Sequence, residues 1–285
     1  MKKIVLCFCF VFFISCTYDA KDHIPGEQEI FSVSDMYLFE DGAHLMVLNS
    51  NLNRAYDYSR ISILKMDEEN NKNSVVSSVL LEPLGGRFIV SSDEKSVFVT
   101  TRDEGLLYKI DVVENSDGVV NLKKPDRSSV LEMQTEPYAL AFGRDEKYIA
   151  VTHIANGEVI VVNPLNMDIK NIFKLNNSVV DVVYDKSLNV FVAVHKNKSF
   201  LTVFRLVHES DEKVSVIRSV VDIPVPTPGN GVRSVVTSEN PGEYLISYRN
   251  NHSGVAFPAV MKVRLSGDIA ENIFMEQIAF IPVNG

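Results

Sequence analysis

The segment from residue 135 to residue 163 constrains the fold of this chain most, because variants of it recur along the sequence. It reads TEPYALAFGRDEKYIAVTHIANGEVIVVN. Short apolar runs alternate with polar breaks, which is typical of β-strands joined by tight turns. We interpret it as an inner strand (138–142), a polar hairpin (143–147), a second strand (148–152), a loop closing on Gly157 and a third strand (158–163). The chain is therefore predicted to be an array of one β-unit.

Five such units can be counted from about residue 31 to the C-terminus. The expected strands lie at 33–39, 43–48, 60–66 and 75–81 in the first unit, within 87–113 and 118–133 in the second, at 169–175 at the end of the third, within 179–207 and 214–223 in the fourth, and within 232–254, 259–265 and 272–281 in the fifth. No sustained 3.6-residue apolar period appears outside the first sixteen residues. The sequence predicts an all-β protein.

One residue marks the end of the second strand in each unit, and the spacing of these anchor residues measures the repeat. The anchor residues are Asn49, Arg102, His153, His195 and Arg249. Their steps of 53, 51, 42 and 54 residues match a blade of four strands, so the spacing predicts a β-propeller. Inner runs such as YALAF and VVDVVY are apolar throughout, as expected of strands buried on both faces. A β-sandwich is the alternative, but it would lack the recurrent hairpin and anchor.

The first sixteen residues, MKKIVLCFCFVFFISC, read as an export signal. Lys2 and Lys3 precede an apolar run over 4–14, which suits a signal core but is too short for a helix that spans a bilayer. All three cysteines of the chain lie in this segment, at positions 7, 9 and 16. The remainder therefore has no disulfide, no thiolate metal site and no cysteine nucleophile.

The end of this segment, FISC, resembles the lipobox of bacterial lipoproteins. We therefore predict a signal peptide over 1–15, lipid such as palmitate on Cys16, a polar tether over 16–30 and a β-propeller over 31–285. Residue 17 is Thr rather than Asp, and in a Gram-negative envelope this resemblance implies the outer membrane, at its periplasmic face or surface. The alternative is an ordinary secretory signal with an incidental cysteine.

The repeat resembles that of the YVTN β-propeller proteins, in which a Pro-Tyr-Gly-Leu-Ala-Phe strand leads through Pro-Asp-Gly-Lys to Tyr-Val-Thr-Asn. PYALAFGRDEKYIAVTH matches it well, as does SSDEKSVFVTTRDEG of the second unit, whereas the fourth and fifth units match more loosely. Relatives include surface-layer proteins, ligand binders, lactonase-like enzymes and propeller subunits of quinoprotein dehydrogenases. Rings of this family usually have seven blades, so five units indicate either a five-bladed ring or an incomplete seven-bladed one.

The resemblance implies that the anchor residues gather at the mouth of the central channel, where such propellers usually bind ligands. Two arginines and two histidines there could bind a small anion. The long loops of the first and fifth units would add Arg54, Tyr56, Tyr58, His252 and Phe257. The alternative is that the anchors only cap their turns by bonding to backbone. Hairpin acids on the opposite face, at positions 93, 94, 145 and 146, read as solvated turn residues.

These features predict a membrane-anchored binding or scaffold module of the cell envelope, with an envelope protein or a small anionic ligand as partner. We expect no cofactor, no metal site and no catalysis. The alternatives are a lactonase-like hydrolase, a propeller subunit of a periplasmic dehydrogenase, and a structural envelope protein. The formal net charge of −9 argues against nucleic acid as a partner.

Overall fold

The structure is a computed structural model, and it describes residues 23–67, 72–116, 118–133, 136–175, 177–196, 198, 200–210, 213–223, 232–248, 259–269 and 272–282. Within these ranges the chain forms five antiparallel sheets that follow one another along the sequence. Two single-turn 3-10 helices, Arg127–Ser129 and Arg144–Glu146, complete the regular structure of this part. Among these residues, no helix is long and apolar enough to cross a membrane.

The strands of each sheet are as follows. The first sheet contains Val33–Leu38 (β1), His44–Asn49 (β2), Ser59–Asp67 (β3) and Lys72–Leu81 (β4). The second contains Gly85–Val90 (β5), Ser96–Thr101 (β6), Leu106–Glu114 (β7), Val120–Leu122 (β8) and Val130–Glu132 (β9). The third contains Pro137–Phe142 (β10), Ile149–His153 (β11), Glu158–Asn163 (β12) and Asp168–Lys174 (β13). The fourth contains Val179–Asp185 (β14), Val190–His195 (β15), Phe200–Ser210 (β16) and Lys213–Asp222 (β17). The fifth contains Val232–Thr237 (β18), Glu243–Tyr248 (β19), Ala259–Asp268 (β20) and Asn272–Pro282 (β21).

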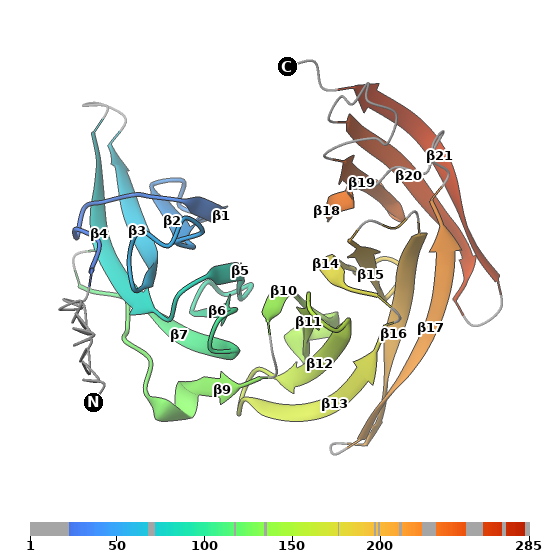
Figure 1. The fold of residues 1–285 in the computed structure, drawn as a ribbon, viewed down its shortest axis with the longest axis horizontal. Coiled ribbons are helices and arrows are strands. Elements are labelled where there is room, and N and C mark those ends of the chain that lie inside the picture. The colour runs from blue at the N-terminus through green and yellow to red at the C-terminus, as the bar shows by residue number, and fades with distance from the viewer. Residues whose placement is uncertain are drawn as a thin grey trace, which may run out of the picture.

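Each sheet has the up-and-down order of a propeller blade, with the first strand innermost and the last outermost (Figure 1). The second sheet differs because its outer position is shared: β8 pairs with the far end of β7, and β9 pairs with the near end. This explains why the expected last strand within 118–133 had no clear single location. The prediction of an all-β chain built from propeller blades is confirmed.

The innermost strands share an irregularity in register. In all five sheets the pairing of the first two strands shifts near the start of the first strand, for example between Val33 and Asp35 and between Val179 and Asp181. Such a bulge bends a strand and increases its twist. Its recurrence keeps the inner strands equivalent around the central axis.

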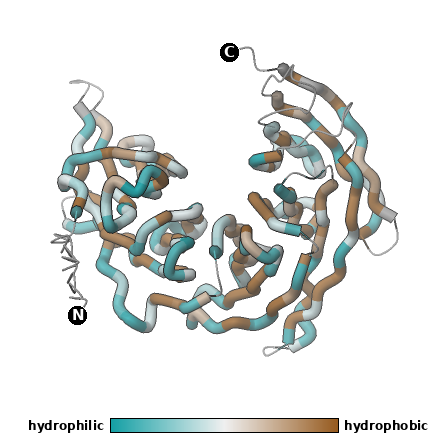
Figure 2. Tube along the Cα trace, in the orientation of Figure 1, coloured by the Kyte–Doolittle hydropathy of each residue, from teal (hydrophilic) through white to brown (hydrophobic). Residues whose placement is uncertain are grey.

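The core lies between consecutive sheets rather than within any one of them. Each cluster there combines fully buried side chains from consecutive sheets: Met46 and Ile61 with Val97, Phe98 with Ile149, Ala150 with Phe191, and Val192 with Ile246. Burial of a Val, Ile, Met or Phe side chain stabilises the fold by about 1.5–3 kcal/mol. Figure 2 shows hydrophobic residues along the strands, alternating with hydrophilic ones on the outer strands.

The five sheets form an arc that does not close within the described residues. Figure 1 shows the first sheet (blue) and the fifth (red) on either side of an opening. Part of the predicted tether, from residue 23 onward, packs on the first sheet. Arg60 of β3 donates to the carbonyls of Pro25 and Gly26, and the amide of Gln28 exchanges two hydrogen bonds with the backbone of Val75.

Candidate functional site

The anchor residues occupy equivalent positions in the sheets. Asn49, His153 and His195 are the last residues of β2, β11 and β15, and Arg102 directly follows β6. All four therefore lie at the same end of the second strand of their blade. The fifth anchor, Arg249, lies outside the described residues, as do His252 and Phe257.

Three of the anchors are fully buried and bonded to nearby groups. Oδ1 of Asn49 accepts from the amide of Phe31 at 2.8 Å. Nδ1 of His153 lies 3.4 Å from the carbonyl of Glu158. Nδ1 of His195 lies 3.1 Å from the carbonyl of Asn177, and its Nε2 lies 2.8 Å from the hydroxyl of Thr202. These contacts fix the turns, as the backbone-bonding alternative expects.

Burial lowers the pKa of both His153 and His195. Each imidazole is therefore neutral at neutral pH. With Nδ1 of His195 facing a carbonyl, its proton belongs on that nitrogen, which leaves Nε2 to accept from the hydroxyl of Thr202.

Three anchors each leave one buried polar atom without a hydrogen-bond partner among the described residues. These atoms are Nδ2 of Asn49, Nε of Arg102 and Nε2 of His153. Among the four described anchors, the guanidinium of Arg102 is the most accessible group. It lies 3.6 Å from the carboxylate of Glu136 and 5.6 Å from the ring centre of Tyr138. An anion site at the anchors stays a prediction, and Arg102 is the residue through which it is best tested.

The long loop of the first sheet reaches the same end of the molecule as Arg102. Nη2 of Arg54 lies 3.2 Å from the carboxylate of Asp103, the residue after Arg102. The ring of Tyr56 lies 4.6 Å from that of Phe31, and its hydroxyl bonds to Glu29. Arg54 is therefore linked to the anchor face through Asp103, and Tyr56 is linked to the segment before β1.

A second group of charged residues joins the inner strands and was missed by the sequence reasoning. Asp35 of β1, Arg87 of β5 and Asp181 of β14 occupy equivalent positions next to the bulge of their strands. Nη1 of Arg87 lies 3.5 Å from Asp35, and Nη2 lies 3.8 Å from Asp181. The guanidinium thus connects the first, second and fourth sheets past the inner strand of the third.

Each of these carboxylates also accepts a hydrogen bond from the backbone of the sheet that follows its own. Asp35 accepts from the amide of Phe88, and Asp181 accepts from the amide of Val235. Burial raises the pKa of both carboxyls, and the charge of Arg87 offsets only part of that effect. For Arg87, the attraction of Asp181 and Asp35 outweighs burial and raises the pKa of the guanidinium. These contacts indicate a structural role around the axis.

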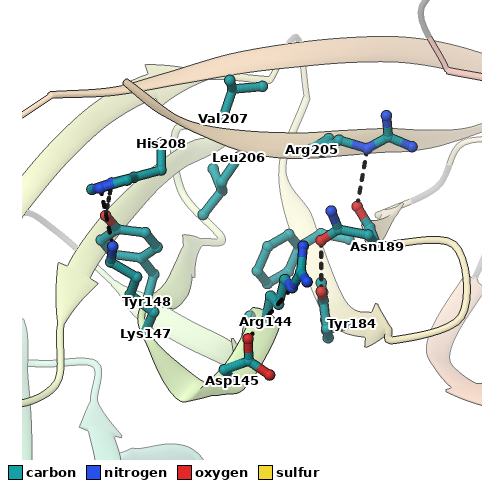
Figure 3. Close-up of a pocket in the computed structure, with 12 residues that line it drawn as sticks. Arg144, Asp145, Lys147, Tyr148, Tyr184, Asn189, Arg205, Leu206, Val207 and His208 are labelled. Atoms are coloured by element: carbon teal, nitrogen blue, oxygen red, sulfur yellow. Dashed lines mark hydrogen bonds and ion pairs between the residues drawn. The ribbon is translucent and has the colours of Figure 1, made fainter. Parts of the chain in front are cut away.

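A pocket of about 420 Å³ lies on the opposite face, between the third and fourth sheets. It is bounded by the β10–β11 hairpin, the β14–β15 turn and the end of β16 (Figure 3). At one end, Arg144 and Tyr184 lie near Asn189; at the other end are Lys147, Tyr148 and His208. This pocket was not predicted, because the hairpin residues read as solvated turns.

Hydrogen bonds order both ends of the pocket. The hydroxyl of Tyr184 donates to Oδ1 of Asn189 at 2.7 Å, and burial raises the pKa of Tyr184, which keeps that proton in place. The guanidinium of Arg205 donates to the carbonyls of Leu188 and Asn189, both at 3.2 Å. At the other end, Nζ of Lys147 lies 3.0 Å from Nε2 of His208, whose Nδ1 lies 2.7 Å from the hydroxyl of Tyr148.

Two of the four hairpin acids connect blades. Glu94 accepts from the hydroxyl of Tyr37 and from the amide of Glu40, both at 2.9 Å. Glu146, its counterpart in the third sheet, accepts from the amide of Ser92 at 2.6 Å. Asp145, by contrast, is mostly exposed. Both glutamates are turn residues and partly exposed, as expected, but each also bonds to the preceding sheet, which the sequence did not indicate.

No protein-family model matches the chain. No curated protein matches its sequence. Solved structures do resemble it in fold. A periplasmic gluconolactonase of Pseudomonas aeruginosa aligns with a TM-score of 0.65 at 12% identity, covering 88% of this chain and 72% of that one. A putative 6-phosphogluconolactonase of Bacteroides uniformis aligns at 0.63 and 13%, covering 87% and 71%.

The hydrazine synthase of Kuenenia stuttgartiensis aligns with a TM-score of 0.60 at 11% identity, covering 89% of this chain and 68% of that chain. Proteins described by such different activities share this architecture, and a fold does not determine a reaction. At these identities the likeness shows the fold alone: the chain is an all-β propeller of the kind found in lactonase-like proteins.

Proposed function

We propose that this protein is a lipid-anchored β-propeller of the bacterial cell envelope, with repeats of the YVTN type, that binds a partner or small ligand without catalysis. The observation that carries the proposal is the pocket between the third and fourth sheets. Its volume of about 420 Å³ lies within the usual range for small-ligand sites, and its polar groups are held by hydrogen bonds. Such a preformed site favours binding.

The anchoring half of the proposal rests on the sequence of the first sixteen residues. Cys16 and the segment before it lie outside the described residues. We expect the wild-type protein to take up labelled palmitate in cells and to sediment with membranes. The Cys16→Ser variant should do neither. Unchanged labelling in Cys16→Ser would exclude this anchor.

The binding half is tested with the full chain purified from detergent-solubilised envelopes. Affinity capture followed by quantification should recover an envelope partner in a fixed ratio to the chain, or a small molecule should raise the melting temperature. Absence of both would reject the proposal. The same preparation should not turn over a panel of sugar lactones.

A lactonase-like hydrolase is the second candidate, favoured by the structural neighbours described as gluconolactonases. Its reacting groups would lie at the anchor face, where Arg102 is the accessible residue. Turnover of a gluconolactone, abolished in Arg102→Ala but retained in Arg144→Ala on the opposite face, would replace the binding proposal by this one.

A further inference from the structure

We propose that the pocket between the third and fourth sheets binds a small organic anion: a carboxylate or phosphate monoester attached to a ring. This inference rests on the proposed binding function and names the chemistry of its ligand. The site lies on the hairpin face, away from the anchor residues for which an anion was first expected.

The charge of the pocket is the first argument. Arg144, Lys147 and Arg205 line it, and Asp145 is the one acid among the described lining residues. Three basic side chains and one carboxylate therefore line the pocket, whereas the chain as a whole has a formal net charge of −9. Arginine and lysine at a concave surface attract carboxylates and phosphates, and they bind them through charge-assisted hydrogen bonds.

The second argument is that hydrogen bonds position Arg205 and Lys147, while all three basic side chains keep N–H groups that can donate to a ligand. Arg205 uses Nε and Nη2 on backbone carbonyls, and its Nη1 has no partner among the described residues. The side chain of Arg144 is mostly exposed, and within the described part of the chain it forms one ion pair, with Asp145 at 3.4 Å. Nζ of Lys147 is directed to His208 at 3.0 Å, which uses one of its three donors. An entering anion can therefore be bound without breaking these contacts.

The third argument concerns the apolar part of the ligand. Phe191 and Tyr184 line the same pocket, with ring centres 4.9 Å apart, and Phe191 stacks on Phe204 at 4.9 Å and 6°. Position 143 is glycine, and a Cβ there would lie 2.9 Å from the Phe191 ring. The hairpin backbone thus covers the buried Phe191. The half-buried ring of Tyr184, which packs on Phe191, is the aromatic surface against which a flat ring can pack.

The experiment uses the full chain and four probes: benzoate, phenyl phosphate, benzyl alcohol and inorganic phosphate. Titration calorimetry at low and high salt should show binding of benzoate or phenyl phosphate that weakens with added salt. Benzyl alcohol should bind at least tenfold more weakly. Comparison of phenyl phosphate with inorganic phosphate measures the contribution of the ring.

Substitutions of lining residues test whether the probe binds in this pocket. Arg144→Gln and Lys147→Gln, singly and combined, should weaken binding about tenfold or more in the combination, the loss expected for a charge-assisted contact. Lys95→Gln is the matched control, because this lysine is the counterpart of Lys147 in the β5–β6 hairpin, is exposed and does not line the pocket. It should bind as the wild type does.

The outcomes separate this inference from the function it rests on. Equal binding of benzyl alcohol and benzoate would overturn the anion class but leave a ligand site standing. Binding that Arg144→Gln and Lys147→Gln together leave unchanged would overturn the location. If no probe binds, the ligand class is rejected, whereas the proposed function fails only if captured envelopes also yield no partner or ligand.

Discussion

Gly157 occupies a position at which the described fold leaves no room for a side chain. It has φ of +68°, and an added Cβ would lie 2.6 Å from the carbonyl oxygen of Leu175 and would also meet that of Asn177. The carbonyl of Gly157 accepts from the amide of Leu175 at 2.8 Å. The β11–β12 loop is therefore packed directly against the end of the third sheet, and only glycine fits there.

Gly157→Ala should lower the free energy of unfolding by about 3 kcal/mol, because left-handed strain and backbone overlap add. Gly42→Ala is the control. Gly42 has a similar φ of +66°, but nothing lies within 4 Å of its added Cβ. Gly42→Ala should lower the free energy of unfolding by about 1 kcal/mol, because left-handed strain is its only cost. Urea unfolding measures both, and equal losses would contradict the overlap argument.

His195 provides a prediction on pH at the same scale. Burial lowers its folded-state pKa, so the unfolded chain binds the proton more readily. The stability that the neutral His195 contributes is fully present above about pH 6.5, the ordinary pKa of histidine, and it is lost as the pH falls below that value. Between pH 7.5 and 5.5 the wild type should lose up to about 1.4 kcal/mol per pH unit more than His195→Gln. Parallel pH profiles in urea unfolding would show that His195 does not titrate in this way.

At the scale of elements, the hairpins hold neighbouring blades together. Glu94 lies in the β5–β6 hairpin and accepts two hydrogen bonds from the first sheet. One donor is the hydroxyl of Tyr37. Burial and the contact with Glu94 raise the pKa of this hydroxyl to about 12, so the hydroxyl keeps its proton. The recurrent Asp-Glu-Lys sequence of the hairpins thus forms a turn, and its glutamate also accepts hydrogen bonds from the preceding sheet.

Glu94→Ala should lower the free energy of unfolding by about 1.5 kcal/mol, since two hydrogen bonds are lost at a partly exposed site. Glu94→Gln retains a carbonyl acceptor and should lose less than half of that amount. Urea midpoints compare the variants. An equal loss in both would mean that charge, rather than hydrogen bonding, connects the hairpins.

At the scale of the whole molecule, Arg87 connects sheets that are not neighbours. Its guanidinium lies between Asp35 and Asp181, on the inner strands of the first and fourth sheets. In an arc whose first and last sheets do not meet within the described residues, such a link around the axis resists opening. Its contribution is modest, because the side chain of Arg87 is 28% exposed.

Arg87→Ala should lower the free energy of unfolding by about 2 kcal/mol at pH 7.5, because the buried Asp181 and the partly buried Asp35 lose their counter-charge. Without Arg87 the pKa of both carboxyls rises further, so the folded state binds protons more readily than the unfolded chain does. The loss should therefore shrink as pH falls from 7.5 toward 5. Arg87→Lys keeps the charge and should lose less. A pH-independent loss in Arg87→Ala would point to packing instead.

Sequence patterns predicted the strands of this protein well because strand formation depends on local alternation and turn chemistry. The strand expected at 158–163 is observed as Glu158–Asn163, and the anchors do end the second strands or follow them. The repeat length predicted propeller blades for the same reason. The outer edge of the second sheet was less clear, because two three-residue strands are too short to carry a pattern.

The sequence by itself therefore determined the blade, its period and the position of each anchor residue in it. Only the tertiary structure decided where the side chains point. It buries His153 and His195, brings Arg87 between Asp35 and Asp181, and joins Lys147 to His208 across two sheets. These contacts link residues far apart in the chain, and no local pattern encodes them. They arise from the packing of one blade on the next.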